Sequence, residues 1–367
     1  MNDEEKEKTT PSEQEKNPPK GRGKRRWISS ICIALAALLI FSLLFAAATR
    51  LCMPKYTGAT KEGRLIGEYY AESKIPHDVI LVGDCEVYES VIPAVLWEEY
   101  GISAYVRGSA QQLAWQSYYI LEETLNYETP KAVIFNVLSL KYGEPQNEAY
   151  NRMTLDGMKW SSSKAASVSA SMTEEEDFIT YIFPLLRFHS RWSSLTSEDF
   201  TAFFDYGSVS HSGYLMQKGV VPDTSSADTQ GEPLLETDFP VQSMEYLEKM
   251  RTLCEERGIE LILMKAPTNN WKYWWYDEWD EQISDYAEEH DLRYFNFIAQ
   301  KEKIGLDMAT DTYDAGIHLN VYGAEKFTRY LGQALSDECG LTDRRADADL
   351  QKLWTPLCEK YQNERNG

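Results

Sequence analysis

Apolar residues in this chain fall into short runs that alternate with amphipathic stretches. Five runs are compact, apolar and rich in β-branched residues, as in strands buried on both faces of a parallel sheet. They are Val79–Val82, Ser103–Val106, Ala132–Val137, Glu260–Met264 and Arg293–Phe297. Helical periodicity covers Glu89–Tyr100, Gln112–Tyr127, Ser243–Glu256, Trp279–His290 and Tyr322–Ser336. This alternation predicts right-handed crossovers and an α/β fold, a three-layer α/β/α sandwich around a parallel five-stranded sheet.

The alternation fails between about residues 140 and 242, which are rich in Ser, Thr, Tyr, Met and Trp. We interpret this stretch as an insertion after the third strand, over the edge of the sheet where the strands end. Two interpretations stay open. The insertion is either a lid or acceptor-binding subdomain, or an addition held together by its own aromatic side chains.

The segment Trp27–Thr49 carries no charge, and its 23 residues are enough to span a hydrocarbon core of about 30 Å. Five basic residues lie just before it, and only Arg50 and Lys55 follow closely. This asymmetry predicts a single-pass protein of the cell membrane, with a cytoplasmic N-terminus and the bulk of the chain outside. A cleaved signal peptide is the alternative, but its apolar region is usually about 7–15 residues long, which favours a retained anchor.

The chain therefore divides into five parts. Residues 1–26 form a polar, disordered cytoplasmic tail, 27–49 a transmembrane helix, 50–77 a linker, 78–340 the α/β domain with its insertion, and 341–367 a C-terminal helical tail. The net charge is −21. Residues 1–26 contribute +2 and Arg50 adds one, which leaves −24 for the part beyond the membrane. Such a surface repels phosphates and argues against a nucleic-acid partner.

The six cysteines lie far apart and fit no zinc-site pattern, so we expect no metal and no other cofactor. Cys339 and Cys358 could form a disulfide, but their spacing alone does not show one.

The chemistry of the chain is concentrated in two blocks. Gly83-Asp84-Cys85 ends the first strand and delivers a nucleophile to the carboxyl edge of the sheet, where ligands bind in open α/β folds. Far downstream, Asp311-Thr-Tyr-Asp314-Ala-Gly-Ile-His318 provides an imidazole and acidic residues just before the last sheet-covering helix. A nucleophile, an imidazole base and an orienting carboxylate are the parts of acyl-transfer catalysis.

Each of these residues has a second interpretation. Cys85 could be a small buried apolar residue, as most free cysteines are, whereas a helix beginning near Glu86 and a nearby imidazole would lower its pKa and supply thiolate. His318 is favoured over the other four histidines by its place between a strand and a helix. Either Asp314 or Asp311 could orient its ring, with Asp314 slightly favoured.

The two blocks resemble those of the SGNH/GDSL hydrolase superfamily, in which Gly-Asp-Ser follows the first strand and Asp-x-x-His precedes the last helix. Here Cys85 replaces serine, and Asp314 precedes His318 by four residues. The resemblance implies a flavodoxin-like sandwich of the SGNH hydrolase type. It also implies that the backbone N–H groups of Cys85 and Gly108 bind an oxyanion. Asn136 is a poor match for the family's third donor, because it is expected inside the third strand.

Further candidates for substrate binding follow the same edge or lie in the insertion: Asp84, Gln111, Gln112, Arg187, His189 and Trp271. The two glutamines could equally be ordinary residues at a helix start. Arg187 and His189 could belong to an amphipathic helix that packs on the domain. Trp271 lies in an aromatic run that could stack on a sugar ring or an acyl chain, or simply pack in the core.

Two functions compete at this point. The first is a membrane-anchored extracellular hydrolase (esterase) or O-acyltransferase that acts on acyl esters of an envelope glycan through a Cys-His-Asp site. The chain is similar to extracellular SGNH-like proteins of polysaccharide acetylation and teichoic acid D-alanylation, which implies a membrane-bound O-acyltransferase as a partner. The second is a catalytically inactive module that binds envelope glycan or such a partner.

Overall fold

The computed structural model describes residues 22–205, 207–223, 236–269 and 276–367. Its centre is a parallel five-stranded sheet with the strand order β2-β1-β3-β4-β5. The strands are β1 (Val79–Gly83), β2 (Ala104–Gly108), β3 (Ala132–Asn136), β4 (Glu260–Lys265) and β5 (Arg293–Asn296). This order is the flavodoxin-like one, and it confirms the predicted fold class. The predicted strands agree with the observed ones to within two residues at either end.

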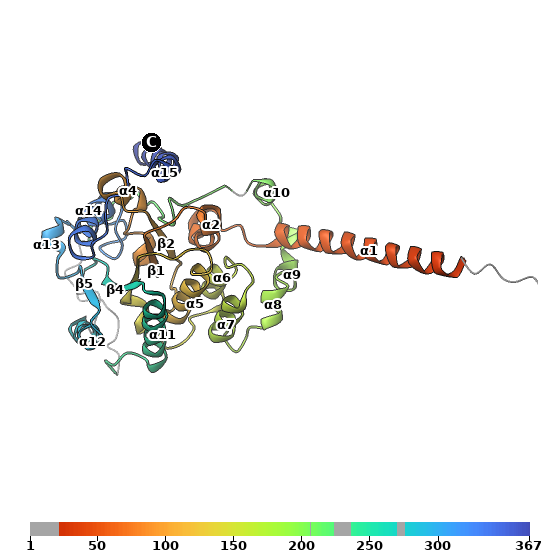
Figure 1. Ribbon diagram of the computed structural model, residues 1–367, viewed down its shortest axis with the longest axis horizontal. Coiled ribbons are helices and arrows are strands. Elements are labelled where there is room, and N and C mark those ends of the chain that lie inside the picture. The colour runs from red at the N-terminus through yellow and green to blue at the C-terminus, as the bar shows by residue number, and fades with distance from the viewer. Residues whose placement is uncertain (1–21, 206, 224–235, 270–275) are drawn as a thin grey trace, which may run out of the picture.

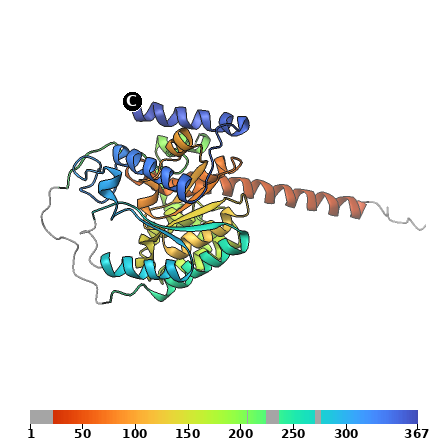
Figure 2. The same ribbon diagram turned by 60° about the vertical axis from the view of Figure 1, so that its left-hand side comes forward.

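Helices cover both faces of the sheet (Figures 1 and 2). Alternate strand residues serve two separate cores: Leu81 and Ile134 point to one, whereas Ile80 and Val133 point to the other. The first core is closed by α4 (Pro93–Tyr100), α14 (Val321–Glu338) and α15 (Ala348–Asn366). The second is closed mainly by α2 (Leu65–Glu72), α5 (Ala114–Thr124), α11 (Val241–Arg257) and α12 (Tyr276–Glu289).

Both flanks of the domain are helical and packed. The stretch expected as a linker contains η1 (Gly58–Arg64) and α2, whose Ile66 and Tyr69 are fully buried. The C-terminal tail forms α15 on the outside of α4, where Trp354 stacks on Trp97 with ring centroids 5.5 Å apart. The chain on either side of residues 78–340 therefore contributes to the same two cores.

The insertion is helical and lies mostly beside the sandwich. It contains η2 (Val137–Lys141), α6 (Glu148–Leu155), α7 (Ser162–Ser171), α8 (Phe178–Ile182), α9 (Leu185–Phe188), η3 (His189–Ser194) and α10 (Ser197–Phe204). The helix α7 packs on α5, and α9, η3 and α10 contact α1 (Arg22–Cys52). The insertion also borders the active edge: the hydroxyl of Thr154 contacts that of Ser109, Leu215 N donates to Tyr88 O at 2.8 Å, and Val221 N donates to Thr312 O at 3.1 Å. Within the described residues, most of the insertion lies beside the sheet and parts of it reach the active edge, so both interpretations of this stretch stay open.

The helix α1 projects away from the domain (Figure 1). In the described part of the chain, its segment Trp27–Cys52 is the one stretch long and apolar enough to cross a membrane, with a mean hydropathy of 2.8. All six cysteines are free thiols, so Cys339 and Cys358 do not form a disulfide.

Candidate active site

Cys85 is placed by a tight turn between β1 and α3 (Cys85–Tyr88). Asp84 caps this turn, since its Oδ1 accepts a hydrogen bond from Glu86 N at 3.2 Å. Position 83 must be glycine, because an added Cβ would lie 2.7 Å from Val87 and 2.9 Å from Asn136. The strand β1 therefore ends in close contact with β3, and the chain turns immediately after it. This turn leaves Cys85 partly exposed at the carboxyl edge.

His318 lies directly against this thiol although 233 residues separate the two in sequence. Its Nε2 is 3.0 Å from Cys85 Sγ, and its Nδ1 is 2.6 Å from Asp314 Oδ2. Asp314 Oδ1 also accepts a hydrogen bond from the backbone N of His318 at 2.7 Å. The loop closes through positive φ angles at Ala315 (61°) and Gly316 (94°), which accommodate the four-residue spacing. The structure thus brings Cys85, His318 and Asp314 into one line of contacts.

Asp311 does not orient the imidazole. Its Oδ2 is 2.7 Å from Lys326 Nζ and accepts a hydrogen bond from Asp307 N at 2.8 Å. It is 2% exposed and holds the loop against the first turns of α14. Of the two carboxylates that the sequence left open, Asp314 is the one at the ring, because Asp311 is committed to this ion pair.

A third carboxylate at the site, Glu89, was missed by the sequence analysis. Its Oε2 lies 3.6 Å from His318 Nδ1, and its Oε1 accepts a hydrogen bond from the Tyr313 hydroxyl at 2.7 Å. Burial raises the pKa of Glu89 to about 7. The available signal was its spacing: four residues after Cys85 is about one helical turn, which returns a side chain to the same face. The residue was instead read as the start of the next helix.

The thiol is a weaker acid than the sequence suggested. Although part of Cys85 reaches the surface, the surrounding atoms desolvate its sulfur, and this burial and then Asp84 raise the pKa of Cys85 to about 11. Burial also disfavours imidazolium at His318, but Cys85, Asp314 and Glu89 outweigh it and raise the pKa of His318 well above its usual value. Cys85 is therefore a weak acid, and His318 is a stronger base than an ordinary imidazole. The imidazole must take the thiol proton as the sulfur attacks.

Beneath the nucleophile lies a buried polar network that occupies two of the candidate residues. Asn136 Nδ2 donates to Asp84 Oδ1 at 3.1 Å and to Glu86 Oε2 at 3.0 Å, while its Oδ1 accepts from Ala266 N at 3.0 Å. Lys265 Nζ lies 2.7 Å from both Glu86 oxygens. The side-chain amide of Asn136 is therefore hydrogen-bonded within this network and does not supply an oxyanion donor. Asp84 is 1% exposed and caps the turn, so it is not placed to bind substrate.

Gly108 does lie beside the nucleophile. It pairs with Gly83 across the β1–β2 ladder. A Cβ at Gly108 would be 3.1 Å from Gly83 O and 3.2 Å from Asp84 O. Its backbone therefore approaches the peptide that precedes Cys85, and its role as an oxyanion donor stays a prediction.

The two glutamines that follow β2 differ in their surroundings. Gln112 is buried and donates to Arg107 O at 3.2 Å and Ser117 Oγ at 3.0 Å, so its amide stabilises the turn. Gln111 is half-buried with a φ of 50°, an uncommon left-handed conformation for a residue other than glycine. Of the two, only Gln111 retains an amide that could face a substrate.

The remaining substrate-binding candidates are not brought to Cys85. Arg187 is paired with Glu148 at 2.7 Å, and the exposed ring of His189 lies 3.0 Å from Leu186 O. Both belong to the helices beside α1, and within the described residues none of their polar contacts reaches Cys85 or His318. Trp271 lies outside the described residues.

Glu89→Gln should change the pH dependence of any turnover by this site. Loss of a negative charge 3.6 Å from Nδ1 lowers the pKa of His318. The acid limb of the kcat/KM profile, measured with an activated ester, should therefore move to lower pH. The plateau should fall about tenfold, or about 1.4 kcal/mol, because imidazolium is less stabilised in the transition state. Glu99→Gln is the matched control, since Glu99 pairs with Arg329 at the surface. A Glu89→Gln profile identical to the wild type would remove Glu89 from the site.

A scan against family models and a search of curated proteins found no match. Among solved structures, the chain is similar to a "putative acylhydrolase" from Bacteroides fragilis, with 10% identity and a TM-score of 0.37 over 75% of this chain and 96% of that one. It is also similar to a GDSL-like lipase from Bacteroides thetaiotaomicron, with 11% identity and a TM-score of 0.36 over 74% of this chain and 97% of that one.

Proposed function

We propose that this protein is a membrane-anchored ester hydrolase or O-acyltransferase that carries an acyl group on Cys85. The observation that supports it best is the contact series in which Sγ lies 3.0 Å from His318 Nε2 and Nδ1 lies 2.6 Å from Asp314. A buried thiol that merely packs has no need of an imidazole at hydrogen-bond distance or of a carboxylate behind that imidazole.

The chemistry follows from these positions. His318 Nε2 takes the thiol proton while Sγ attacks the carbonyl carbon of an ester or thioester. The carbonyl oxygen becomes an oxyanion, for which the backbone N–H groups of Cys85 and Gly108 are the candidate donors. Collapse expels the alcohol or thiol, which receives the proton from His318, and leaves a thioester on Cys85. Water or a sugar hydroxyl then attacks this thioester and gives its proton to His318. The C–S bond breaks, the acyl group leaves as an acid or a new ester, and Cys85 Sγ takes the proton back from His318.

The topology and the substrate class are also part of the proposal. With α1 across the membrane and five basic residues before Trp27, the domain lies outside the cell. A domain with a net charge of −24 in that place suits a neutral or cationic envelope glycan better than a polyanion. A membrane-bound O-acyltransferase that presents the acyl group is the proposed partner.

A second candidate function has one observation in its favour. The pKa of about 11 at Cys85 means that very little thiolate exists at neutral pH without help from His318. The alternative is a non-catalytic module that binds glycan or an acyltransferase at the same edge.

Acyl trapping separates the two candidates. The full chain, purified in detergent, is incubated with p-nitrophenyl acetate, quenched in acid and mapped by mass spectrometry. An acyl enzyme should appear as acetyl on Cys85, whereas the buried thiols Cys254 and Cys358 serve as internal controls and should stay unmodified. A chase with oligosaccharide then distinguishes transfer from hydrolysis. Absence of acetyl from Cys85 under conditions that acetylate surface lysines would favour the binding module.

A further inference from the structure

Exposed apolar side chains gather on one segment of the insertion, Phe178–Phe204, which spans α8 to α10. Outside α1, the described residues include fifteen exposed large apolar side chains, and seven of them fall in these 27 residues. They are Ile179, Ile182, Phe183, Leu186, Trp192, Phe200 and Phe204. Trp192 and Phe204 are 74% and 84% exposed, which is costly for an aromatic side chain that faces only water.

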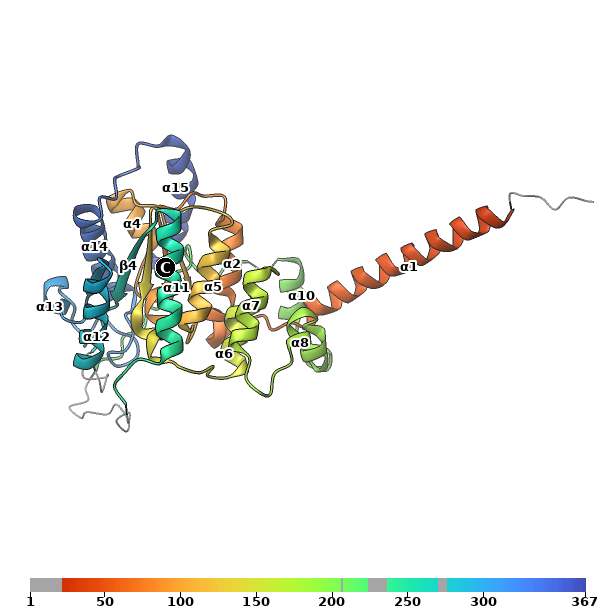
Figure 3. The ribbon, with the colours of Figure 1, turned by 60° about the horizontal axis from the view of Figure 1, so that its bottom comes forward.

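This segment surrounds the point at which α1 leaves the domain (Figures 1 and 3). The ring of Phe183 meets Phe45 edge to face, with centroids 6.0 Å apart. On α10, the ring of Phe203 lies 5.4 Å from the guanidinium of Arg50. Phe45 and Arg50 belong to the last turns of the apolar helix, so the exposed side chains lie at the level where a bilayer would end.

The joint between α1 and the domain is stabilised by basic side chains. They donate hydrogen bonds to the backbone carbonyl groups at the end of the helix. Lys55 Nζ, 6% exposed as a residue, donates to Arg50 O at 2.7 Å, Leu51 O at 3.1 Å and Met53 O at 2.6 Å. Arg191, from the insertion, donates to Cys52 O at 2.8 Å and Met53 O at 2.6 Å. These bonds supply the partners that the last carbonyls of a helix otherwise lack. The orientation of the exposed segment relative to α1 is therefore fixed.

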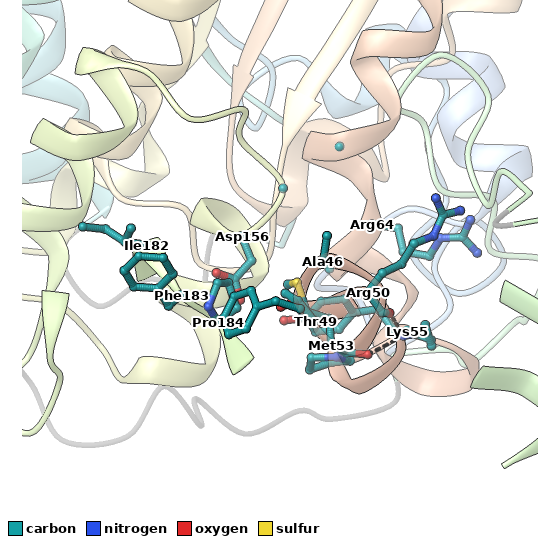
Figure 4. A pocket seen from close by; sticks show the side chains of 16 residues that line it. Ala46, Thr49, Arg50, Met53, Lys55, Arg64, Asp156, Ile182, Phe183 and Pro184 are labelled. Carbon is teal, nitrogen blue, oxygen red and sulfur yellow. Dashed lines mark hydrogen bonds between the residues drawn. The ribbon is translucent and has the colours of Figure 1, made fainter. Parts of the chain in front are cut away.

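A cavity of about 610 Å³ lies in this joint (Figure 4). Its apolar lining comes from both sides, with Phe45 and Ala46 of α1 facing Ile182, Phe183 and Pro184. Gly63 and Arg64 of η1 also line it. The same short helix carries Glu62, which is close enough to Glu89 to contribute to its raised pKa. The helix η1 therefore borders the cavity and also lies near the surroundings of Glu89.

Charge distinguishes the segment from the rest of the domain. Its charged residues are Arg187, Arg191, Glu198 and Asp199, which cancel to a net charge of zero. The domain as a whole carries −24 and would be repelled by an anionic membrane. A surface of zero net charge that is rich in Phe, Leu, Ile and Trp has the composition found at the boundary between headgroups and acyl chains.

We propose that Phe178–Phe204 is a membrane-contact collar, whose exposed side chains lie in the outer leaflet around α1 and whose cavity admits a lipid acyl chain. This proposal rests on the membrane topology given under the proposed function. The collar holds the domain at a fixed tilt, with η1 and the Cys85 site close to the lipid surface. An acyl donor delivered at the membrane would then have a short path to the thiol.

Lipid photolabelling tests the collar with the full chain. The protein is reconstituted into vesicles of phosphatidylcholine and phosphatidylglycerol that contain a phosphatidylcholine with a diazirine on its acyl chain. After irradiation, adducts are mapped by mass spectrometry. The collar peptides should carry roughly tenfold more lipid adducts than peptides around Val241 and Leu353, each of which has an exposed apolar side chain elsewhere on the domain. In Trp192→Ser/Phe204→Ser, labelling of the collar should fall severalfold while turnover of a soluble ester stays unchanged.

The possible results distinguish a failure of the membrane-contact collar from a failure of the proposed function. Adducts confined to α1 would overturn the collar and leave the acyl chemistry untouched. Crosslinks from the collar to a membrane protein in native membranes, in place of lipid, would overturn the lipid assignment in favour of a protein partner. If an impermeant reagent fails to reach the domain from outside intact cells while the collar still labels with lipid, the collar stands and the outward topology fails.

Discussion

Cys85→Ala should reduce ester or thioester turnover by about three orders of magnitude or more. The substitution removes the atom that lies 3.0 Å from His318 Nε2, and removal of a nucleophile leaves only the residual effect of binding and oxyanion stabilisation. The fold should persist, because Cys85 is partly exposed at the edge of the sheet and loses only a sulfur atom. Burst and steady-state rates with an activated ester, together with thermal unfolding, measure both effects.

Cys85→Ser is the informative companion to this variant. Serine can use the same imidazole and the same backbone donors, so a working site should retain part of its esterase activity. Cys254→Ala controls for loss of a thiol elsewhere, since Cys254 belongs to α11 and is buried in the core. Full activity in Cys85→Ala would remove the thiol from the mechanism and favour the binding module.

The sheet could be predicted because its strands are buried on both faces, which makes them visible as continuous apolar runs. The helix boundaries were harder. The pattern over Glu89–Tyr100 predicted one helix, yet α3 ends at Tyr88 and α4 begins only at Pro93, which has the fixed φ suited to a first helical position. The insertion could not be placed from sequence, because its helices pack on α5 and on the end of α1, and these are contacts between distant segments.

The part of the site that lies at the ends of the strands could be predicted from the sequence. Cys85 and His318 each follow from a motif at the carboxyl edge, and topology alone brings them together. The sequence favoured Asp314 over Asp311 only slightly, because the difference depends on Lys326, in the second turn of the next helix, which pairs with Asp311. Glu89 could have been suggested by its spacing of four residues from Cys85, but its contacts with His318 and Tyr313 join segments that are distant in sequence. The expected lowering of the thiol pKa was wrong in sign, because burial outweighs what a helix of four residues can contribute.

Asp314→Asn should lower kcat/KM by about 10³-fold to 10⁴-fold with little change in stability. The asparagine can keep the bond from the backbone N of His318, which is 2.7 Å long in the wild type, so the loop should hold its shape. The amide has no charge to stabilise imidazolium, and its NH₂ group favours the wrong tautomer of the ring. Because Asp314 helps to raise the pKa of His318, the acid limb of the rate profile should also move to lower pH. Steady-state kinetics across pH measures both changes.

Asp311→Asn is the matched control, with the same chemical change three residues away. Asp311 is buried and its partner Lys326 is about half exposed, so loss of this pair should cost about 1–2 kcal/mol of folding free energy. Turnover per folded molecule should be unaffected, because the Oδ2 of Asp311 is bonded to Lys326 and to Asp307 N, away from the ring. Asp314→Asn should therefore lose catalytic rate, whereas Asp311→Asn should lose folding stability. If Asp311→Asn were the variant that lost turnover at full folding, the assignment of the orienting carboxylate would be reversed.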